Sequence, residues 1–287
     1  MTQTAEFFDM SKAPMRIGKV RLKVRDLDNV SAFYQSVMSL NEIERTEHRA
    51  TLGVGRTVLL VLEADPALAP GDRRQAGLFH TAFLMPTRAD LAHWAGHIAT
   101  SRIPLQGASD HIVSEAFYLA DPEGNGIEVY VDRPIQRWLD AGGNIQMTTE
   151  RLDIQDLLSE GKEGGWTGFP DKGSIGHVHL QVGDTSKADN FYRDILGFAV
   201  TVDYPGASFY GSGGYHHQLA GNIWNSRGAG QRPQGMAGLD MVEIVMRDPA
   251  DIAPIVARAE KAGVEVSDKD ENVTLRDPWG VAITLKK

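Results

Sequence analysis

Four stretches of the chain carry apolar residues at i, i+3, i+4 and i+7, the spacing of one face of an amphipathic helix. Each stretch follows a short, largely apolar segment that is typical of a β-strand. The strand segments KVRLKV, HTAFLM, HVHLQV and MVEIVM begin at Lys19, His80, His177 and Met241, and the helical patterns begin 11 residues later in every case, at Val30, Leu91, Ala188 and Ile252. This equal offset predicts a fourfold repeat.

Each predicted helix is followed by turns and short strand-like runs, which close with RTVLLVLE, GNGIEVYV, YHHQLAGNIW or WGVAITLK. The repeating unit is therefore a βαβββ module. One module is too small to bury a face of its own sheet, so we expect an α+β fold in which four βαβββ modules pair to form two cupped mixed sheets. The expected divisions are a tail (1–15), modules 1 and 2 (16–132), a Gly-rich and charged linker with one helix near Leu152 to Leu158 (133–174), and modules 3 and 4 (175–287).

Alternation along the strands predicts which side chains enter the cups, because successive residues of a strand point to opposite faces. In module 3 the apolar set should lie under the helix, and the polar set should face the cup. The apolar set is Val178, Leu180 and Val182, and the polar set is His177, His179 and Gln181.

Two histidines and one glutamate form a candidate metal site. His80 and His177 begin the first strands of modules 2 and 3, where the other modules have Lys19 and Met241, and Glu128 lies among apolar residues of the last strand of module 2. Burying an unpaired carboxylate costs several kcal/mol, so Glu128 needs a cation or strong donors. Two imidazoles and a carboxylate are the facial triad that holds Fe(II) or Mn(II). This site requires module 2 to pair with module 3, and module 1 with module 4.

The composition narrows the alternatives. The chain has 287 residues and no cysteine, so a metal must be held by nitrogen and oxygen. The net charge of −9 argues against nucleic acid as a partner. No run reaches the roughly 18 apolar residues that a spanning helix needs, and the N-terminal residues lack the features of a signal peptide. We therefore expect a soluble, cytoplasmic protein that does not bind membranes.

Three motifs taken together, SEAFYLADPEGNGIEVY, IGHVHLQV and GGYHHQLAGNIW, resemble the vicinal oxygen chelate superfamily of glyoxalases, bleomycin-resistance proteins and extradiol dioxygenases. The resemblance runs from about Ile17 to Lys287 and is strongest to the two-domain catechol 2,3-dioxygenases. It implies an extradiol ring-cleaving enzyme that acts on an aromatic diol, with dioxygen as co-substrate, at Fe(II) or Mn(II) held by His80, Glu128 and His177. It also implies a homo-oligomer.

The resemblance implies further site residues. Tyr118, ten residues before Glu128, would donate a hydrogen bond to a substrate oxygen. His217 would be the acid–base residue, with its neighbour His216 as the alternative. Trp224 and Phe117 are candidates to flank the aromatic ring of the substrate, and His179 and His111 are further candidates for the pocket, His179 because it shares a strand face with His177.

One departure and several alternatives remain. In relatives with conventional module order the triad lies in modules 3 and 4, where Met241 and Thr284 cannot form it; some relatives that cleave hydroquinones exchange the pairing. The cup that contains Lys19 and Arg21 is expected to be metal-free. Iron or manganese, and catechol or hydroquinone, stay open. The alternative functions are a glyoxalase-type isomerase, lyase or transferase, usually with a second carboxylate ligand, and a non-catalytic small-molecule binding protein.

Overall fold

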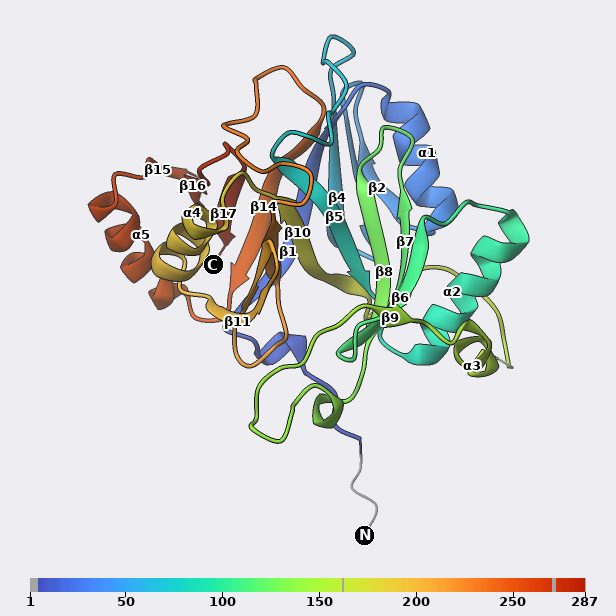
Figure 1. Cartoon of the computed structure of the whole chain (residues 1–287). Helices are drawn as coiled ribbons and strands as arrows, with labels where there is room; N and C mark the ends of the chain where they lie inside the picture. The colour runs from blue at the N-terminus through green and yellow to red at the C-terminus, as the bar shows by residue number, and fades with distance from the viewer. Residues whose placement is uncertain (1–4, 162, 270–271, 287) are drawn as a thin grey trace.

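Two curved mixed sheets form the molecule (Figure 1), whose computed structural model describes residues 5–161, 163–269 and 272–286. One sheet pairs module 4 with module 1, in the order β15 (Val266–Lys269), β16 (Asn272–Arg276), β17 (Ala282–Lys286), β14 (Gly238–Met246), β1 (Met15–Val24), β4 (Thr57–Ala64), β3 (Arg49–Val54) and β2 (Asn41–Arg45). The other pairs module 3 with module 2, in the order β11 (Ala199–Tyr204), β12 (Ala207–Gly211), β13 (Leu219–Asn222), β10 (Ser174–Gln181), β5 (Gly77–Leu84), β8 (Gly126–Asp132), β7 (Ser114–Ala120), β6 (Gly107–Asp110) and β9 (Glu150–Arg151). The predicted α+β fold and its exchanged module pairing are confirmed.

The first strands of the paired modules form the central seam of each sheet. In one sheet β1 lies antiparallel to β14, and in the other β10 lies antiparallel to β5. Each first strand also pairs in parallel with the last strand of its own module. Every sheet therefore takes one module from 16–132 and one from 175–287.

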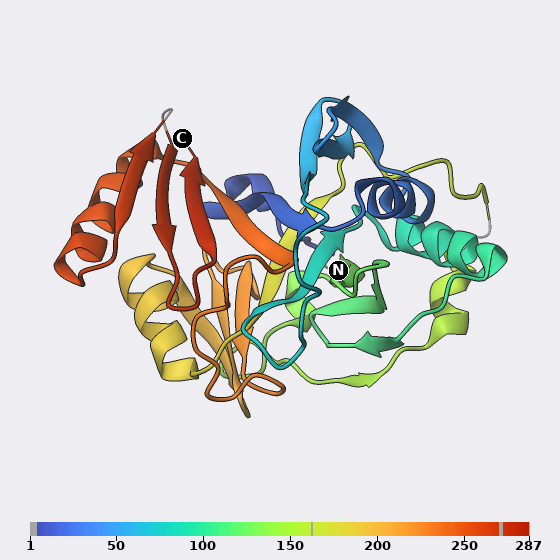
Figure 2. The ribbon, with the colours of Figure 1, turned by 90° about the horizontal axis from the view of Figure 1, so that it is seen from above.

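The helices form where the repeat predicts them. They are α1 (Leu27–Val37), α2 (Arg88–Ser101), α4 (Thr185–Asp189), which continues as the π-helical η3 (Asn190–Ile195), and α5 (Ile252–Lys261), which follows the 3₁₀ turn η4 (Pro249–Asp251). The side chains of Asp26 and Thr87 accept hydrogen bonds from backbone N–H groups in the first turns of α1 and α2, which satisfies donors that the helix itself leaves free. Seen from above, α1 and α2 lie on one side of the molecule and α4 and α5 on the other (Figure 2).

One large hydrophobic core connects the helices with the sheets. Its members include the predicted apolar strand faces, among them Val20 and Leu22 of β1 and Val178 and Leu180 of β10. The two helices of the first half also contact each other directly, because the Trp94 indole N–H donates to the Val37 carbonyl oxygen at 3.0 Å. With the helices on these faces, the opposite faces of the sheets are left to form the cups.

Segment 133–174 contributes to the sheet and the core as well as connecting the halves. It forms the 3₁₀ turn η2 (Ile135–Arg137), the edge strand β9 and the helix α3 (Ile154–Ser159), close to the helix predicted there. Trp138, Leu152 and Leu157 are buried. The residues before β1 form the 3₁₀ turn η1 (Met10–Lys12), and Phe8 packs on Trp138.

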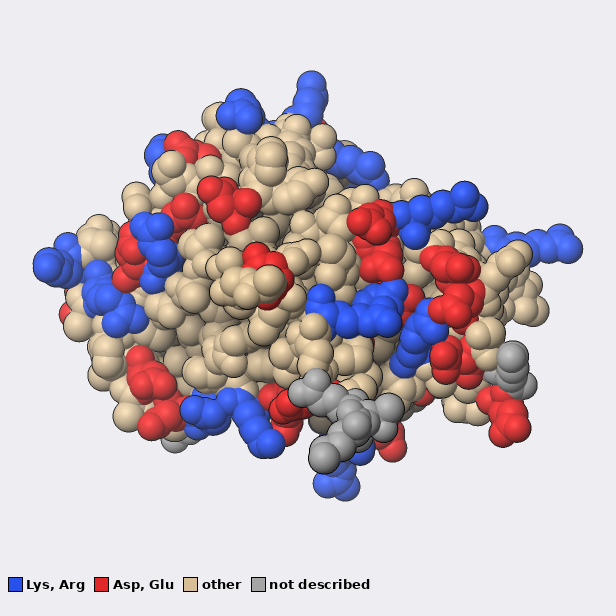
Figure 3. Space-filling model, turned by 60° about the horizontal axis from the view of Figure 1, so that its bottom comes forward, with Lys and Arg blue, Asp and Glu red and all other residues tan. Residues whose placement is uncertain are grey.

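None of the helices in the described residues combines the length and the apolar composition that spanning a bilayer requires. On the face seen in Figure 3, acidic and basic side chains lie interspersed rather than in broad areas of one sign.

Gly126, at the start of β8, provides a test of the packing between β8 and β5. A Cβ atom there would lie 1.9 Å from the Phe79 carbonyl oxygen, a backbone atom that cannot rotate away. We expect Gly126→Ala to lower the free energy of unfolding by about 1–3 kcal/mol, measured by urea denaturation.

The matched control for this substitution is Gly96→Ala. Gly96 lies in α2 with open space around its Cβ position. Gly96→Ala should leave the free energy of unfolding unchanged or raise it by up to about 1 kcal/mol. Equal stability of Gly126→Ala and the wild type would contradict the close packing.

Candidate metal centre and pocket

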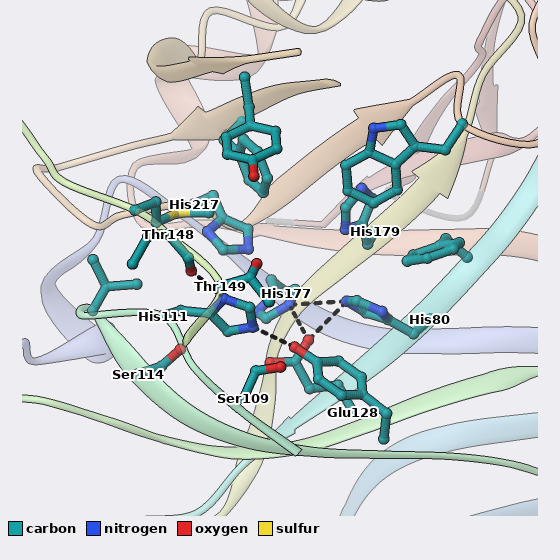
Figure 4. Close-up of a pocket in the computed structure, with 17 residues that line it drawn as sticks. His80, Ser109, His111, Ser114, Glu128, Thr148, Thr149, His177, His179 and His217 are labelled. Atoms are coloured by element: carbon teal, nitrogen blue, oxygen red, sulfur yellow. Dashed lines mark hydrogen bonds and ion pairs between the residues drawn. The ribbon is translucent and has the colours of Figure 1, made fainter. Parts of the chain in front are cut away.

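Three neighbouring strands bring His80, His177 and Glu128 together in the cup of the module 2 and module 3 sheet (Figure 4). In the ladders Ala82 of β5 pairs with His177 of β10 on one side and with Glu128 of β8 on the other. His80, two residues before Ala82, is on the same face of β5. The exchanged pairing thus places residues from both halves of the chain at one point.

The three side chains fit a single metal ion. His80 Nε2 lies 2.9 Å from Glu128 Oε2, His177 Nε2 lies 3.2 Å from the same oxygen, and the two nitrogens are 3.3 Å apart. Octahedral bonds of about 2.1 Å place adjacent ligand atoms about 3.0 Å apart, so these atoms match one face of such a polyhedron. Within the described residues, this is the group of histidines and carboxylates close enough to share an ion.

The electrostatics favour the ligand forms of these groups. Burial opposes ionisation of Glu128, but the imidazoles of His177 and His80 outweigh burial and hold the pKa of the carboxyl well below its usual value. Burial lowers the pKa of His177 to about 4 although Glu128 opposes that shift. An ionised carboxylate beside a neutral imidazole is the state that a divalent cation binds.

Tyr118 lies opposite Glu128 in the β7–β8 ladder. Its hydroxyl is 2.5 Å from His111 Nε2, and His111 Nδ1 is 2.6 Å from the Thr148 carbonyl oxygen. A carbonyl oxygen only accepts, so His111 Nδ1 carries the hydrogen and, in a neutral ring, Nε2 accepts from Tyr118. Burial and the neighbouring Glu128 raise the pKa of Tyr118 well above its usual value, which keeps the phenol neutral.

His217 lines the cavity, whereas His216 points away from it. The His217 ring lies 4.2 Å from the His177 ring, measured between centroids. His216 is fully buried behind it against Trp138, at a centroid distance of 4.9 Å. The opposite orientation that alternation predicts for the two neighbours is therefore observed.

His179 and Trp224 lie on the aromatic side of the cavity. The His179 ring is 5.0 Å from the His80 ring, and its Nε2 accepts from the Asn222 amide at 3.0 Å. Burial, with neighbouring histidines, lowers the pKa of His179 well below its usual value. Trp224 is half-exposed, and Phe79 packs edge-on against it.

The suggestion that Phe117 flanks a substrate ring is wrong. Phe117 is buried in the core on the helix side of β7, where its ring lies 5.9 Å from Trp94. Adjacent strand residues face opposite ways, so Phe117 must leave the cup when Tyr118 enters it.

The cavity itself has a volume of about 260 Å³ and largely apolar walls, and among the described residues no lysine or arginine lines it. Met147, Thr148 and Thr149, from the segment between the halves, form part of its wall. The remaining lining comes from both modules: Phe79, His80, Ser109, His111, Val113, Ser114, Tyr118, Glu128, His177, His179, Tyr204, Phe209, His217 and Trp224.

Sequence reasoning misses Thr148, which lines the cavity, and Asp132, which bonds His216. Nothing in the sequence indicates that Thr148 approaches His111, because the contact joins the linker to the turn between β6 and β7. A signal did exist for Asp132, which shares a face of β8 with Glu128 and Tyr130 through simple alternation. Its carboxylate Oδ1 lies 2.8 Å from His216 Nε2.

In the other sheet Lys19, which takes the place of His80, forms an ion pair with Glu243, which takes the place of His179. Lys19 Nζ lies 2.9 Å from Glu243 Oε2, and the glutamate side chain is only 8% exposed. Thr284, which takes the place of Glu128, instead bonds Thr274. In that cup an ammonium group balances the buried carboxylate.

Comparison with known proteins gives a family, a relative and two solved structures. A family model described as the glyoxalase/bleomycin resistance protein/dioxygenase superfamily matches residues 16–129 and 174–285. A protein of Bacillus subtilis (strain 168) named catechol-2,3-dioxygenase is 38% identical over 267 residues, which cover 91% of this chain and 93% of that protein.

Solved structures share the fold at lower identity. A putative dioxygenase from Bacillus subtilis has a TM-score of 0.62 at 13% identity, over 96% of this chain and 85% of that chain. Glyoxalase I from Zea mays has a TM-score of 0.58 at 16% identity, over 94% and 92%.

Glu128→Gln tests the metal centre directly. The substitution removes the negative charge but keeps the shape, so we expect affinity for Fe(II) or Mn(II) to fall at least about 100-fold. Bound metal would be measured by elemental analysis after equilibrium dialysis.

The control is Glu243→Gln in the other cup, since Glu243 is also buried but bonds Lys19. It should bind the metal as the wild type does, with folding checked by circular dichroism. Wild-type affinity in Glu128→Gln would exclude this centre.

Proposed function

Because the chain belongs to the glyoxalase/bleomycin resistance protein/dioxygenase superfamily, we propose that it is an extradiol dioxygenase, which cleaves a catechol-type ring with dioxygen at Fe(II) or Mn(II). The ion would be held by His80, Glu128 and His177. The observation that carries the proposal is that these three ligand atoms lie within 3.3 Å of one another in a largely apolar cavity. His217 and Tyr118 line the same cavity. The 38% identity to a catechol-2,3-dioxygenase supports it.

The cavity suits a small aromatic diol. A cavity of about 150 Å³ accommodates benzene, so about 260 Å³ leaves room for a ring with two hydroxyls and a small substituent. Phe79, Phe209 and Trp224 offer aromatic surfaces to such a ring. A bound metal ion would supply Lewis acidity and a common site for the diol and dioxygen.

The proposed roles of the protein groups follow from their hydrogen bonds. His217 takes a proton from a substrate hydroxyl and returns it later, because burial, with the nearby His177, lowers its pKa well below the usual value and leaves it neutral. The Tyr118 hydroxyl donates its hydrogen bond to His111 Nε2 and keeps its proton, which leaves the phenol oxygen free to accept from a substrate hydroxyl. This differs from the donor role that the family resemblance implies.

A glyoxalase-type function is less well supported. Such enzymes usually add a second carboxylate to the metal site, and the candidate centre within the described residues contains Glu128 alone. The likeness to glyoxalase I, at 16% identity, concerns the fold.

An oxygen electrode tests the reaction. Metal-loaded protein mixed with a panel of catechols and hydroquinones should consume one O₂ for each diol, with both ¹⁸O atoms of labelled dioxygen recovered in the ring-opened product. A chelator should abolish the uptake. If no diol in the panel supports oxygen consumption by fully loaded protein, the proposal is wrong.

His217→Gln tests the acid–base role. We expect kcat to fall at least about 100-fold with metal content unchanged, because the amide cannot exchange a proton. His97→Gln, on α2 outside the cavity, is the matched control, and its kcat should stay at the wild-type value. Equal kcat in the two variants would remove His217 from the mechanism.

The substrate should be uncharged apart from its diol. In the part of the chain that the structure describes, no lysine or arginine lines the cavity, so a carboxylate on the ring would be buried without a cation. We expect kcat/KM for 4-methylcatechol to exceed that for 3,4-dihydroxybenzoate at least about 100-fold, or about 2.7 kcal/mol. Comparable values for the two compounds would show that the cavity has a cationic contact after all.

A further inference from the structure

His216 is a buried polar residue that the metal centre does not explain. Its ring is completely buried, in contact with Tyr215 at a centroid distance of 4.0 Å. Polar atoms in such a place are costly unless each is hydrogen-bonded. Both ring nitrogens are bonded: Nε2 lies 2.8 Å from Asp132 Oδ1, and Nδ1 lies 2.8 Å from His217 Nδ1.

The hydrogen-bonding capacity of each group determines which atom donates between Asp132, His216 and His217. A carboxylate oxygen only accepts, so His216 Nε2 carries the hydrogen that goes to Asp132. In a neutral His216 ring Nδ1 then has a lone pair and no hydrogen. The hydrogen between the two rings must therefore belong to His217 Nδ1.

Burial, with the nearby His177, lowers the pKa of His217 and keeps its ring neutral, so a hydrogen on Nδ1 leaves none on Nε2. This nitrogen has no hydrogen-bond partner among the described residues, while the His217 ring lines the cavity beside His177. An unprotonated nitrogen that faces the cavity is the form that a general base requires.

We propose that Asp132 and His216 are positioning residues for His217, which fix its tautomer and the orientation of its ring. The tautomer itself does not depend on the proposed function. Only its role as a base toward a substrate hydroxyl rests on that proposal. The substrate O–H bond breaks, its proton binds His217 Nε2, and the Nδ1 hydrogen stays in the bond to His216. When Nε2 returns the proton to an oxygen, His217 regains the same tautomer.

The surroundings hold Asp132 rigidly. The Tyr215 hydroxyl donates to Asp132 Oδ1 at 3.1 Å, and the Tyr130 hydroxyl lies 2.7 Å from the Tyr215 hydroxyl. Gly176 leaves the space for that second phenol, since a Cβ atom there would lie 1.8 Å from the Tyr130 oxygen. The two buried phenols therefore form a chain of hydrogen bonds that ends at the Asp132 carboxylate.

Nitrogen NMR of the wild-type protein tests the tautomer without any turnover. In ¹⁵N-histidine-labelled protein loaded with diamagnetic Zn(II), His217 should show a protonated Nδ1 and an unprotonated Nε2, and His216 the reverse. A hydrogen on His217 Nε2, or a doubly protonated His216, would overturn the inference. Because the measurement needs no dioxygenase activity, its failure is distinct from failure of the proposed function.

Substitution of His216 tests the consequence. His216→Phe keeps an aromatic ring but removes the acceptor for His217 Nδ1, so we expect the His217 signals to shift toward the Nε2–H tautomer and kcat to fall about 10- to 100-fold. KM and metal content should not change. Trp138→Phe, which alters the packing around His216 without touching these nitrogens, should leave both the tautomer and kcat unchanged.

A second variant covers the case in which His216→Phe does not fold. His216→Gln can donate its amide hydrogen to Asp132 and accept from His217 with its carbonyl oxygen. It should retain the His217 tautomer and more of the activity than other replacements. Unchanged kcat in His216→Phe, or an equal loss in Trp138→Phe, would reduce His216 to a packing residue.

Discussion

A carboxylate buried between two imidazoles is the interaction on which this structure depends. Glu128 is almost inaccessible to solvent, and its nearest polar partners are His80 of its own module and His177 of the other half of the chain. Only a seam between β5 and β10 supplies both partners. The exchanged pairing and the metal centre therefore depend on each other. If module 1 paired with module 2, and module 3 with module 4, Glu128 and His177 would be separated and buried without each other as partners.

The second sheet also has to balance a buried carboxylate, and it does so with an ammonium group rather than imidazoles. Its modules pair through the same kind of central seam and it also buries a glutamate, Glu243, but there the neighbouring module contributes Lys19. An ammonium group balances the charge in place and leaves no ligand for an ion. One architecture thus contains one cup suited to a metal and one closed by an ion pair.

A single strand, β8, organises much of the site. Alternation sends Glu128, Tyr130 and Asp132 to the same face, where they meet the ligand histidines, Tyr215 and His216 in turn. Segment 133–174 completes the arrangement, because Thr148 accepts from His111 and Trp138 covers His216. The stretch between the two halves of the chain is thus part of the pocket wall.

The sequence alone determined the repeat, the strand faces and the pairing of modules. Periodicity and equal offsets fix which side of its own strand a residue occupies. The need of a buried Glu128 for a cation, with His80 and His177 as the other ligands of a facial triad, then predicted that modules 2 and 3 share a cup. The same rule, applied consistently, would have excluded Phe117 once Tyr118 was placed. Only the tertiary structure decided that Thr148 closes the cavity over His111 and that His216 connects Asp132 to His217. Those contacts join segments with no common period, in one case through the Thr148 main-chain carbonyl. Periodicity carries no information about which such segment packs against a given face.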